Sequence, residues 1–374
     1  MIRTAGRRKP DPTLADWLER WHIDFWLLAL LCAVGALGLV VLYSASGHSS
    51  AQVISQFQRM LLGLVVMAAV AQAPPELYRT VAPWLFGITF ALLLATLGLG
   101  DAAKGARRWL DLGVVRFQPS EFMKLAMPMM VASFLHLRHL PPRLLTICAA
   151  LGIIAIPTAL IAVQPDLGTG LLVIAAGLFA LFFAGLQWRW IVLAAGSVAA
   201  VAPVLWERLH DYQKKRVLTF LDPESDPLGA GYHITQSKIA IGSGGVFGKG
   251  WLNGTQANLD FLPESHTDFI FAVYSEEWGL MGIIVLLELY MAIVGRGLII
   301  AARAKDTFQR LLAASLSMTF FIYVFINMGM VIGLLPVVGV PLPLVSYGGT
   351  HVVSLLAGFG MLMSIQTHKK LLSN

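Results

Sequence analysis

The chain has 374 residues, of which 57% are hydrophobic and 13% are charged, and its mean hydropathy is +0.72. These values exclude an ordinary soluble domain and are typical of a polytopic membrane protein. The net charge of +6 identifies no partner, because in a membrane protein the placement of charge carries more information than its sum. Cys32 and Cys148 lie in apolar runs, so no disulfide is expected.

The chain begins with a polar segment, residues 1–22, which we expect to be a cytoplasmic tail. The uncharged run Phe25–Tyr43 follows it. This run is too long for the core of a signal peptide and is close to the roughly 20 residues that cross a bilayer. It is therefore predicted to be an uncleaved first transmembrane helix.

Nine further apolar runs follow, and several need flanking residues to complete a span. They are Met60–Ala73, Val81–Gly100, Leu125–Leu137, Leu144–Val163, Leu167–Leu186, Trp190–Trp206, Phe269–Val294, Leu311–Ile332 and Val352–Thr367. The last two are separated by residues 333–343, which are rich in Gly and Pro. The sequence predicts an all-α polytopic integral membrane protein of about ten transmembrane helices, in a single domain over residues 1–374.

Basic residues orient the predicted helices. An even number of spans puts both termini on one side, and more than half of the Lys and Arg residues fall in the tail and loops of that side. The positive-inside rule makes this side cytoplasmic. Residues 207–268, between helices 7 and 8, then form one long extracytoplasmic loop.

The long loop ends at Asp268, directly before the apolar run that opens at Phe269. A charged group at the mouth of a transmembrane helix is expensive and is often functional. Asp268 is therefore the candidate catalytic residue. The alternative is that its side chain caps the eighth helix.

The outer face carries more cations than correct membrane insertion favours. They are Lys104, Arg107, Arg108, Arg116 and Lys124 in or beside one short loop, Arg59 at the start of the second helix, and Arg208, Lys214, Lys215, Arg216, Lys238 and Lys249 in the long loop. Contact with lipid phosphates is one explanation. We favour a site for an anionic ligand, in which Arg108 and Lys124 grip a diphosphate.

Two predicted helix starts add polar side chains to the same face. Gln118 or Ser120 is expected to cap the helix that contains Glu121, and Glu121 faces Lys124 at position i+3. That pair is either a shielded ion pair or part of the binding site. Asp166 either caps the sixth helix or pairs with an outer arginine and shapes the site.

Within the long loop, a short helix is expected around His233, with Gln236 and Ser237 on its polar face and Lys238 beside them. Three isoleucines between residues 234 and 241 indicate an apolar side that lies on the membrane surface. The Gly-rich run 242–250 lacks the spacing of a P-loop. It is expected to be a hinge or a close approach of the backbone to a ligand.

The sequence shows no Cys/His metal cluster, no Ser-His-Asp arrangement and no dinucleotide fingerprint. The outer face instead combines one carboxylate, several cations and a few amides. Such a set suits transfer from a diphosphate-activated donor, because a carboxylate accepts a proton from an attacking hydroxyl and cations stabilise the departing diphosphate. A divalent cation at the diphosphate, Mg²⁺ or Mn²⁺, is left open with unknown ligands, and no organic cofactor is expected.

A specific set of motifs is spread between Asp24 and Lys370. They are Lys104-Gly105-Ala106 with Arg108-Trp109-Leu110, Gln118-Pro119-Ser120-Glu121, Gln164-Pro165-Asp166-Leu167-Gly168, Gly231-Tyr232-His233 with Gln236-Ser237, the run from Pro263 to Phe271, Glu276-Glu277 with Gly279, and the run from Leu342 to Gly349. This set resembles the SEDS family (shape, elongation, division and sporulation). Asp222-Pro223 and Gly231-Tyr232-His233 favour its elongation branch over its division branch.

The resemblance implies a peptidoglycan glycosyltransferase that polymerises lipid II for cell elongation and rod shape. It implies inversion at the MurNAc anomeric carbon and release of undecaprenyl diphosphate. Asp268 matches the family's catalytic aspartate, and Arg108 and Lys124 match its functional outer cations. The further substrate-binding candidates are Glu121, Lys104, Arg59, Gln118, Asp166, His233, Gln236, Ser237, Lys238 and Ser346.

The resemblance also implies a location and partners. The protein is expected in the bacterial cytoplasmic (inner) membrane, with its active site on the outer face. Lipid II, a class B penicillin-binding protein transpeptidase, other elongation-complex proteins and membrane lipids are expected partners, and nucleic acid is not. The long outer loop, Leu311–Ile332 and the last span are expected to contact the transpeptidase.

Two other functions stay open on the sequence alone, a lipid II flippase and a non-catalytic scaffold of the elongation machinery. A flippase is expected to have ionisable groups along a path through the bilayer, whereas here they gather on the outer face. Glu288 is the mid-span exception, and it is expected to face other helices or to be protonated. His351 is a second departure from the family pattern, in which a small residue is common at this position.

Overall fold

The structure is a computed structural model that describes residues 18–99, 101–103, 106–111, 116–208, 211–222, 226, 229–258, 262 and 264–368. Each of the ten predicted apolar runs lies on a helix of this structure. The helices are α2 (Phe25–Ala45), α3 (Ser50–Gln72), α4 (Pro75–Leu99), α5 (Pro119–His136), α6 (Leu144–Val163), α7 (Leu167–Phe183), α8 (Trp188–Arg208), α12 (Ile270–Ala302), α13 (Thr307–Val331) and α14 (Thr350–Thr367).

Seven helices in the described ranges are both long and apolar enough to cross a membrane, namely α2, α3, α4, α6, α12, α13 and α14. The apolar helix α7 is shorter, and α5 carries buried charged residues near its start. The polytopic, helical membrane architecture predicted from the sequence is therefore confirmed. The sequence-based count of about ten membrane spans stays a prediction.

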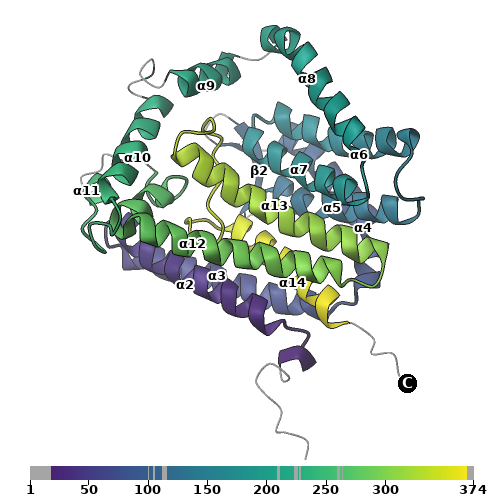
Figure 1. Ribbon diagram of the computed structural model, residues 1–374, viewed down its shortest axis with the longest axis horizontal. Coiled ribbons are helices and arrows are strands. Elements are labelled where there is room, and N and C mark those ends of the chain that lie inside the picture. The colour runs from purple at the N-terminus through teal and green to yellow at the C-terminus, as the bar shows by residue number, and fades with distance from the viewer. Residues whose placement is uncertain are drawn as a thin grey trace, which may run out of the picture.

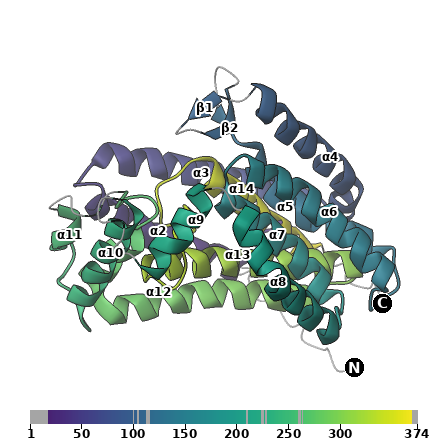
Figure 2. The ribbon, with the colours of Figure 1, turned by 90° about the horizontal axis from the view of Figure 1, so that it is seen from above.

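The two C-terminal helices form the interior of the bundle (Figures 1 and 2). In their most apolar stretches, 78% of the residues of α13 and 67% of those of α14 are buried, against 22% in α3. α13 packs on α5, α7 and α12, and α14 packs on α3. This burial restricts the predicted lipid-facing partner surface on Leu311–Ile332 and the last span to their exposed residues, such as Phe325 of α13.

Small residues allow the close approach of α14 to α3. A Cβ atom on Gly360 would lie 2.5 Å from the carbonyl oxygen of Met67, and one on Gly63 would lie 2.5 Å from Leu356 Cδ1. Membrane helices commonly associate through such small residues, because lipid provides no hydrophobic driving force between helices. The apolar pattern predicted these helices but not which faces meet.

A short antiparallel sheet lies between α4 and α5, and an all-α fold did not predict it. Its strands are β1 (Asp101–Ala103), β2 (Ala106–Asp111) and β3 (Arg116–Phe117), in the order β1-β2-β3. The strands pair backbone groups that a connection at the membrane edge would otherwise leave without partners. Because the sheet is so short, its apolar alternation gives almost no signal in the sequence.

Side-chain caps set the starts of α2 and α3, and the apolar runs misplace only the second of them. The carboxylate of Asp24 accepts the backbone N–H of Leu27 at 2.8 Å and also pairs with Arg296 of α12, which fixes the start of α2. Ser49 caps α3, so this helix begins at Ser50, well before the apolar run that opens at Met60. Amphipathic first turns are invisible to a search for apolar runs alone.

The long loop contains three helices, α9 (Asp211–Leu221), α10 (Ala230–Gly244) and α11 (Thr255–Asn258). Figure 1 shows α8, α9 and α10 as an arc around the outside of the bundle. The predicted helix around His233 is α10, which packs on α12, and its residues Ile234 and Ala240 are buried. Its apolar side therefore faces protein as well as the surroundings, since Ile239 is exposed.

The Gly-rich run after α10 closes onto α12 rather than onto a ligand. A Cβ atom on Gly244 would lie 2.2 Å from the carbonyl oxygen of Ser275, and one on Gly248 would lie 2.1 Å from that of Glu277. The fully buried carboxylate of Glu276 accepts hydrogen bonds from Lys249 Nζ at 2.6 Å and from the backbone N–H of Thr255 at 2.9 Å. Glu276 thus anchors the end of the long loop to α12.

The mid-span carboxyl group of Glu288 does not face the bundle. Glu288 is exposed on α12, on a stripe that also includes the exposed residues Ile284, Val285 and Met291. The expectation that it faces other helices is wrong. The sequence shows only that the group is unusual, because facing depends on which side of α12 meets α13.

Candidate functional site

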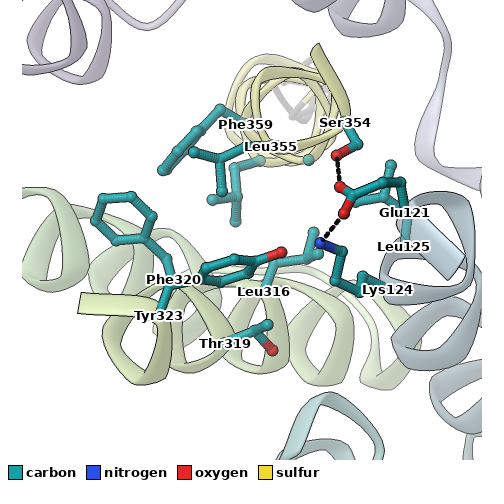
Figure 3. Close-up of a pocket in the computed structure, with 12 residues that line it drawn as sticks. Glu121, Lys124, Leu125, Leu316, Thr319, Phe320, Tyr323, Ser354, Leu355 and Phe359 are labelled. Atoms are coloured by element: carbon teal, nitrogen blue, oxygen red, sulfur yellow. Dashed lines mark hydrogen bonds and ion pairs between the residues drawn. The ribbon is translucent and has the colours of Figure 1, made fainter. Parts of the chain in front are cut away.

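A polar cavity of about 270 Å³ opens among α5, α7, α13 and the start of α14. Its wall includes Glu121, Lys124, Asp166, Tyr323 and His351. Trp109 of β2 and the loop residues Gly339, Val340 and Pro341 complete part of the lining. A smaller apolar pocket lies against it and shares Glu121, Lys124 and Tyr323 (Figure 3).

The ion pair of Glu121 and Lys124 lies at the centre of the wall. Lys124 Nζ is 2.6 Å from Glu121 Oε1, and the two residues are only 6% and 5% exposed. Ser354 of α14 donates a hydrogen bond to Glu121 Oε2 at 2.9 Å, as Figure 3 shows. Lys124 Nζ also lies 4.9 Å from the centre of the Tyr323 ring. The shielded ion pair is confirmed, and because the pair also lines the cavity, its part in a binding site stays a prediction.

Proline and glutamine set the position of this pair. Gln118 is the N-cap residue of α5 and Pro119 is its first helical residue, where the missing N–H costs nothing. Glu121 and Lys124 then fall one turn apart on one face. The Gln118 side chain makes no cap bond but donates from Nε2 to Asp166 Oδ2 at 3.0 Å.

Asp166 serves two purposes. Its Oδ1 accepts the backbone N–H of Thr169 at 3.3 Å and so caps α7. Its Oδ2 is held by Gln118, and the residue lines the cavity. The cap is confirmed, and the cavity wall is built from the starts of α5 and α7 together.

Asp268 lies next to the loop that forms one wall of the cavity. A Cβ atom on Gly339, which lines the cavity, would be 3.5 Å from Asp268 Oδ2. Asn327 Nδ2 holds the segment by donating to the carbonyl oxygens of Asp268 at 2.9 Å and Val340 at 2.8 Å. The N-cap residue of α12 is Phe269, so Asp268 does not cap that helix.

Ser346 forms hydrogen bonds that hold the segment before Asp268 in place. Its fully buried hydroxyl donates to the carbonyl oxygen of Thr267 at 2.6 Å and accepts the backbone N–H of Leu342 at 2.7 Å. Gln56 of α3 bonds the carbonyl oxygen of Ser346 and the N–H of Gly348. Ser346 therefore has no surface for a ligand in this structure, and its hydroxyl shapes the loop instead.

Arg59 reaches the same region from α3. Its guanidinium lies 4.6 Å from the centre of the Tyr347 ring, whose other neighbour is the ring of His266 at 6.0 Å. A Cβ atom on Gly349 would be 3.9 Å from Arg59 Nε. The structure thus places Arg59 beside the start of α14 and near the Asp268 segment.

The predicted polar residues of the long loop differ in their burial and in their contacts. Ser237 is fully buried and donates to the carbonyl oxygen of Val331 at 2.7 Å, which ties α10 to α13. His233 stacks on Phe269 with 5.5 Å between ring centres, and burial lowers the pKa of its imidazole. Gln236 is half-buried and Lys238 is exposed beside Gly333. Of these four residues, only His233 has a described contact with a residue adjacent to Asp268, namely Phe269.

Some predicted residues lie outside the described part of the chain. Lys104 is not among the described residues, and Arg108 is described only as part of the backbone of β2. Their proposed roles stay predictions. Trp109, next to Arg108, does line the cavity, so β2 reaches the site.

Sequence reasoning missed several residues of the cavity wall. Tyr323, Thr169 and Ser354 sit inside apolar helices, where a single polar residue usually satisfies a backbone group. His351 was noticed as unusual but was not assigned to the site. The signal that was available is its position in a segment without Asp, Glu, Lys or Arg.

The cavity wall offers two carboxylates, those of Glu121 and Asp166, as candidate ligands for a metal ion. Among the described residues, no three or more His, Cys, Asp or Glu side chains gather as metal ligands do. Mg²⁺ commonly uses one or two carboxylates together with the phosphates of its substrate. Asp166 and Glu121 fit that sparse pattern, although both already accept hydrogen bonds.

Comparison with known proteins agrees with this geometry. Residues 24–371 match the family model described as a cell cycle protein and named for FtsW, RodA and SpoVE. The chain is 54% identical to the peptidoglycan glycosyltransferase MrdB of Escherichia coli K12 over 364 residues, which covers 97% of this chain and 98% of that one. It is 37% identical to the probable peptidoglycan glycosyltransferase FtsW of Trichlorobacter lovleyi, over 93% and 94% of the two chains.

Solved structures show the same fold. A chain from a peptidoglycan synthase complex, described as coordinating polymerization and crosslinking, has a TM-score of 0.81 and 30% identity, with 92% and 97% of the chains covered. The rod shape determining protein RodA of Thermus thermophilus has a TM-score of 0.70 and 28% identity, with 92% and 96% covered. The chain described here belongs to the SEDS family, the group of FtsW, RodA and SpoVE.

Proposed function

We propose that this protein is a peptidoglycan glycosyltransferase that polymerises lipid II into β-1,4-linked glycan strands during cell elongation. The chain is a homologue of proteins with that name, at 54% identity over nearly its full length. The observation that carries the proposal is the polar cavity. The buried Lys124 lines this cavity, and the carboxylate of Asp268 lies next to Gly339, which is another lining residue.

The proposed topology places the cavity at the outer leaflet of the bacterial cytoplasmic membrane. Ten spans, both termini in the cytoplasm and an extracytoplasmic segment at residues 207–268 satisfy the distribution of Lys and Arg. The start of α5 and the starts of α7, α12 and α14 then all lie on the outer side. Lipid II presents its sugars and diphosphate at this depth, while its polyprenyl tail stays in the bilayer.

Asp268 acts as the general base in the proposed reaction. Its carboxylate takes the proton from the 4-hydroxyl of a GlcNAc residue, and that oxygen forms a bond to the anomeric carbon of MurNAc. The bond from this carbon to the diphosphate oxygen breaks with inversion, and undecaprenyl diphosphate leaves as an anion. A second carboxylate to protonate the leaving group is unnecessary, because a diphosphate departs with its negative charge.

Lys124 stabilises the leaving diphosphate, assisted by Arg108. In the structure its charge is balanced by Glu121, so the buried pair avoids the cost of an isolated ion. A diphosphate that enters the cavity offers Lys124 a second anion, while Ser354 continues to hold Glu121. Gln118 and Asp166 line the cavity with this pair, and Arg59 and His233 lie beside the start of α14 and beside Phe269, so all four are proposed to contact the substrate. A divalent cation at the diphosphate remains part of the proposal.

The partner is proposed to be a class B penicillin-binding protein transpeptidase. One structural neighbour comes from a complex that joins polymerization to crosslinking. We place the partner's membrane helix in a groove of about 270 Å³ between α12 and α13, which Leu287, Met291 and Phe325 line. The anchored end of the long loop is proposed to contact its outer domain.

Purified protein in detergent, supplied with lipid II, tests the function directly. Glycan strands should appear with the unsubstituted protein and be absent with Asp268→Ala. A protein that only transports lipid II would produce no strands in either case and would instead move lipid II between leaflets of a vesicle.

A further inference from the structure

His351 is the second residue of α14, and its side chain lines the cavity beside Glu121 and Lys124. It shares a face of α14 with Ser354, one turn further along, which bonds Glu121. The ring packs on the loop before the helix, since a Cβ atom on Gly348 would lie 2.0 Å from its Cε1. The imidazole is therefore held between the loop and the ion pair.

The Nε2 atom of His351 is buried and has no hydrogen-bond partner among the described residues. Leaving such a group unsatisfied costs about 1–3 kcal/mol, and most buried polar side-chain atoms in proteins have a partner. Glu121 and Lys124 line the same cavity as the ring, and Arg59 Nε would lie 3.9 Å from a Cβ atom on Gly349, two residues before His351. A side chain that served only for packing would not need a polar nitrogen atom here, because an apolar ring would avoid this cost.

Donor groups suited to an anion gather around this ring. Lys124, which is paired with Glu121, lines the cavity, and Arg59 lies beside the start of α14, while Asp166 adds a second carboxylate to the wall. α14 begins at Thr350, and its N-cap residue Gly349 has no side chain to cap it, so its first backbone N–H groups and its dipole point toward the same end. The 270 Å³ cavity connects these groups.

We propose that His351 is a further substrate-binding residue, which donates a hydrogen bond to a phosphate oxygen of the lipid diphosphate beside Lys124. The inference rests on the proposed function for the identity of the ligand, but not for the presence of an anion site. In this proposal His351 strengthens binding of the diphosphate and does not take part in the proton transfer.

Binding of farnesyl diphosphate to the purified full-length protein tests the inference, with inorganic diphosphate as a parallel probe. His351→Ala should weaken binding of both probes by about tenfold, the effect of one hydrogen bond to a charged group. His351→Gln, which keeps an N–H donor, should recover part of the loss. His368→Ala removes an imidazole at the other end of α14 and should leave both affinities unchanged.

Polymerisation of lipid II gives a second readout. His351→Ala should raise KM about tenfold and change kcat by less than about twofold, because the residue binds the diphosphate and does not transfer the proton. Thermal unfolding checks that both variants are folded. If the alanine variant fails to fold, the glutamine variant alone decides. It should then show a measurable loss of affinity for both probes that is smaller than about tenfold.

Several results would overturn the inference. They are an unsubstituted protein that binds neither probe, an alanine variant within twofold of it, and a glutamine variant as weak as the alanine variant. Failure of the proposed function looks different, because the protein would then bind the probes with the stated dependence on His351 but form no glycan strands.

Discussion

At the residue scale, the Glu121–Lys124 pair makes a prediction that separates stability from substrate binding. Lys124→Met leaves the Glu121 carboxylate buried without its cation, which typically costs about 3–5 kcal/mol. The double variant Glu121→Gln with Lys124→Met removes both charges and should recover most of the lost thermal stability. If Lys124 holds the diphosphate, the double variant should still be inactive in lipid II polymerisation. Wild-type activity in the stable double variant would show that the pair is only structural.

Arg108 and Arg107 provide a matched comparison on β2. The family resemblance assigns function to the arginine beside Trp109, and Trp109 lines the cavity. Arg108→Ala should therefore weaken turnover of lipid II by about 10-fold or more, as loss of a charge-assisted contact does, whereas Arg107→Ala should change it little. Equal effects of the two substitutions on turnover and binding would indicate general attraction of an anionic lipid to a basic surface.

Single residues of the site were predictable where a residue type is costly in its setting. Asp268 at a helix mouth and Lys124 directly before an apolar run stand out in the sequence for this reason. The roles of Ser237 and Ser346 were not predictable, because a hydroxyl is as suited to a backbone carbonyl as to a sugar. Their burial decides between the two, and burial depends on contacts from distant helices.

At the scale of elements, the groove between α12 and α13 is the proposed seat of the partner's membrane helix. Leu287→Trp should fill this groove and reduce co-purification of the class B penicillin-binding protein, with lipid II polymerisation by the isolated protein unchanged. Leu145→Trp is the control, since Leu145 is 83% exposed on α6, away from the groove. Equal co-purification of both variants would place the partner elsewhere.

Helix positions were well predicted from apolar runs, but helix facing was not. The runs locate all ten helices because a bilayer demands long apolar segments. They cannot tell that α13 and α14 are central, since a buried and a lipid-facing helix have the same composition. Glu288 illustrates the limit, because its exposure depends on which residues of α12 its neighbouring helices cover, and the apolar run does not show this.

At the scale of the whole molecule, the proposed catalytic residue and the proposed docking groove occupy different parts of the protein. Asp268 lies beside Gly339 at the polar cavity, whereas the groove between α12 and α13 is almost entirely apolar. Asp268→Ala should therefore keep the complex with the transpeptidase intact in co-purification. Loss of the complex, with the protein still folded, would make the Asp268 segment part of the interface.

The central claim is that the carboxylate of Asp268 removes a proton during strand synthesis. Loss of a positioned general base costs about 10²–10⁴-fold in rate. The most direct measurement is the rate of lipid II polymerisation by purified Asp268→Asn, a substitution of nearly the same shape that cannot act as a base. We predict a loss within that range, with an unchanged melting temperature and unchanged binding of farnesyl diphosphate. A rate equal to that of the unsubstituted protein would contradict the account.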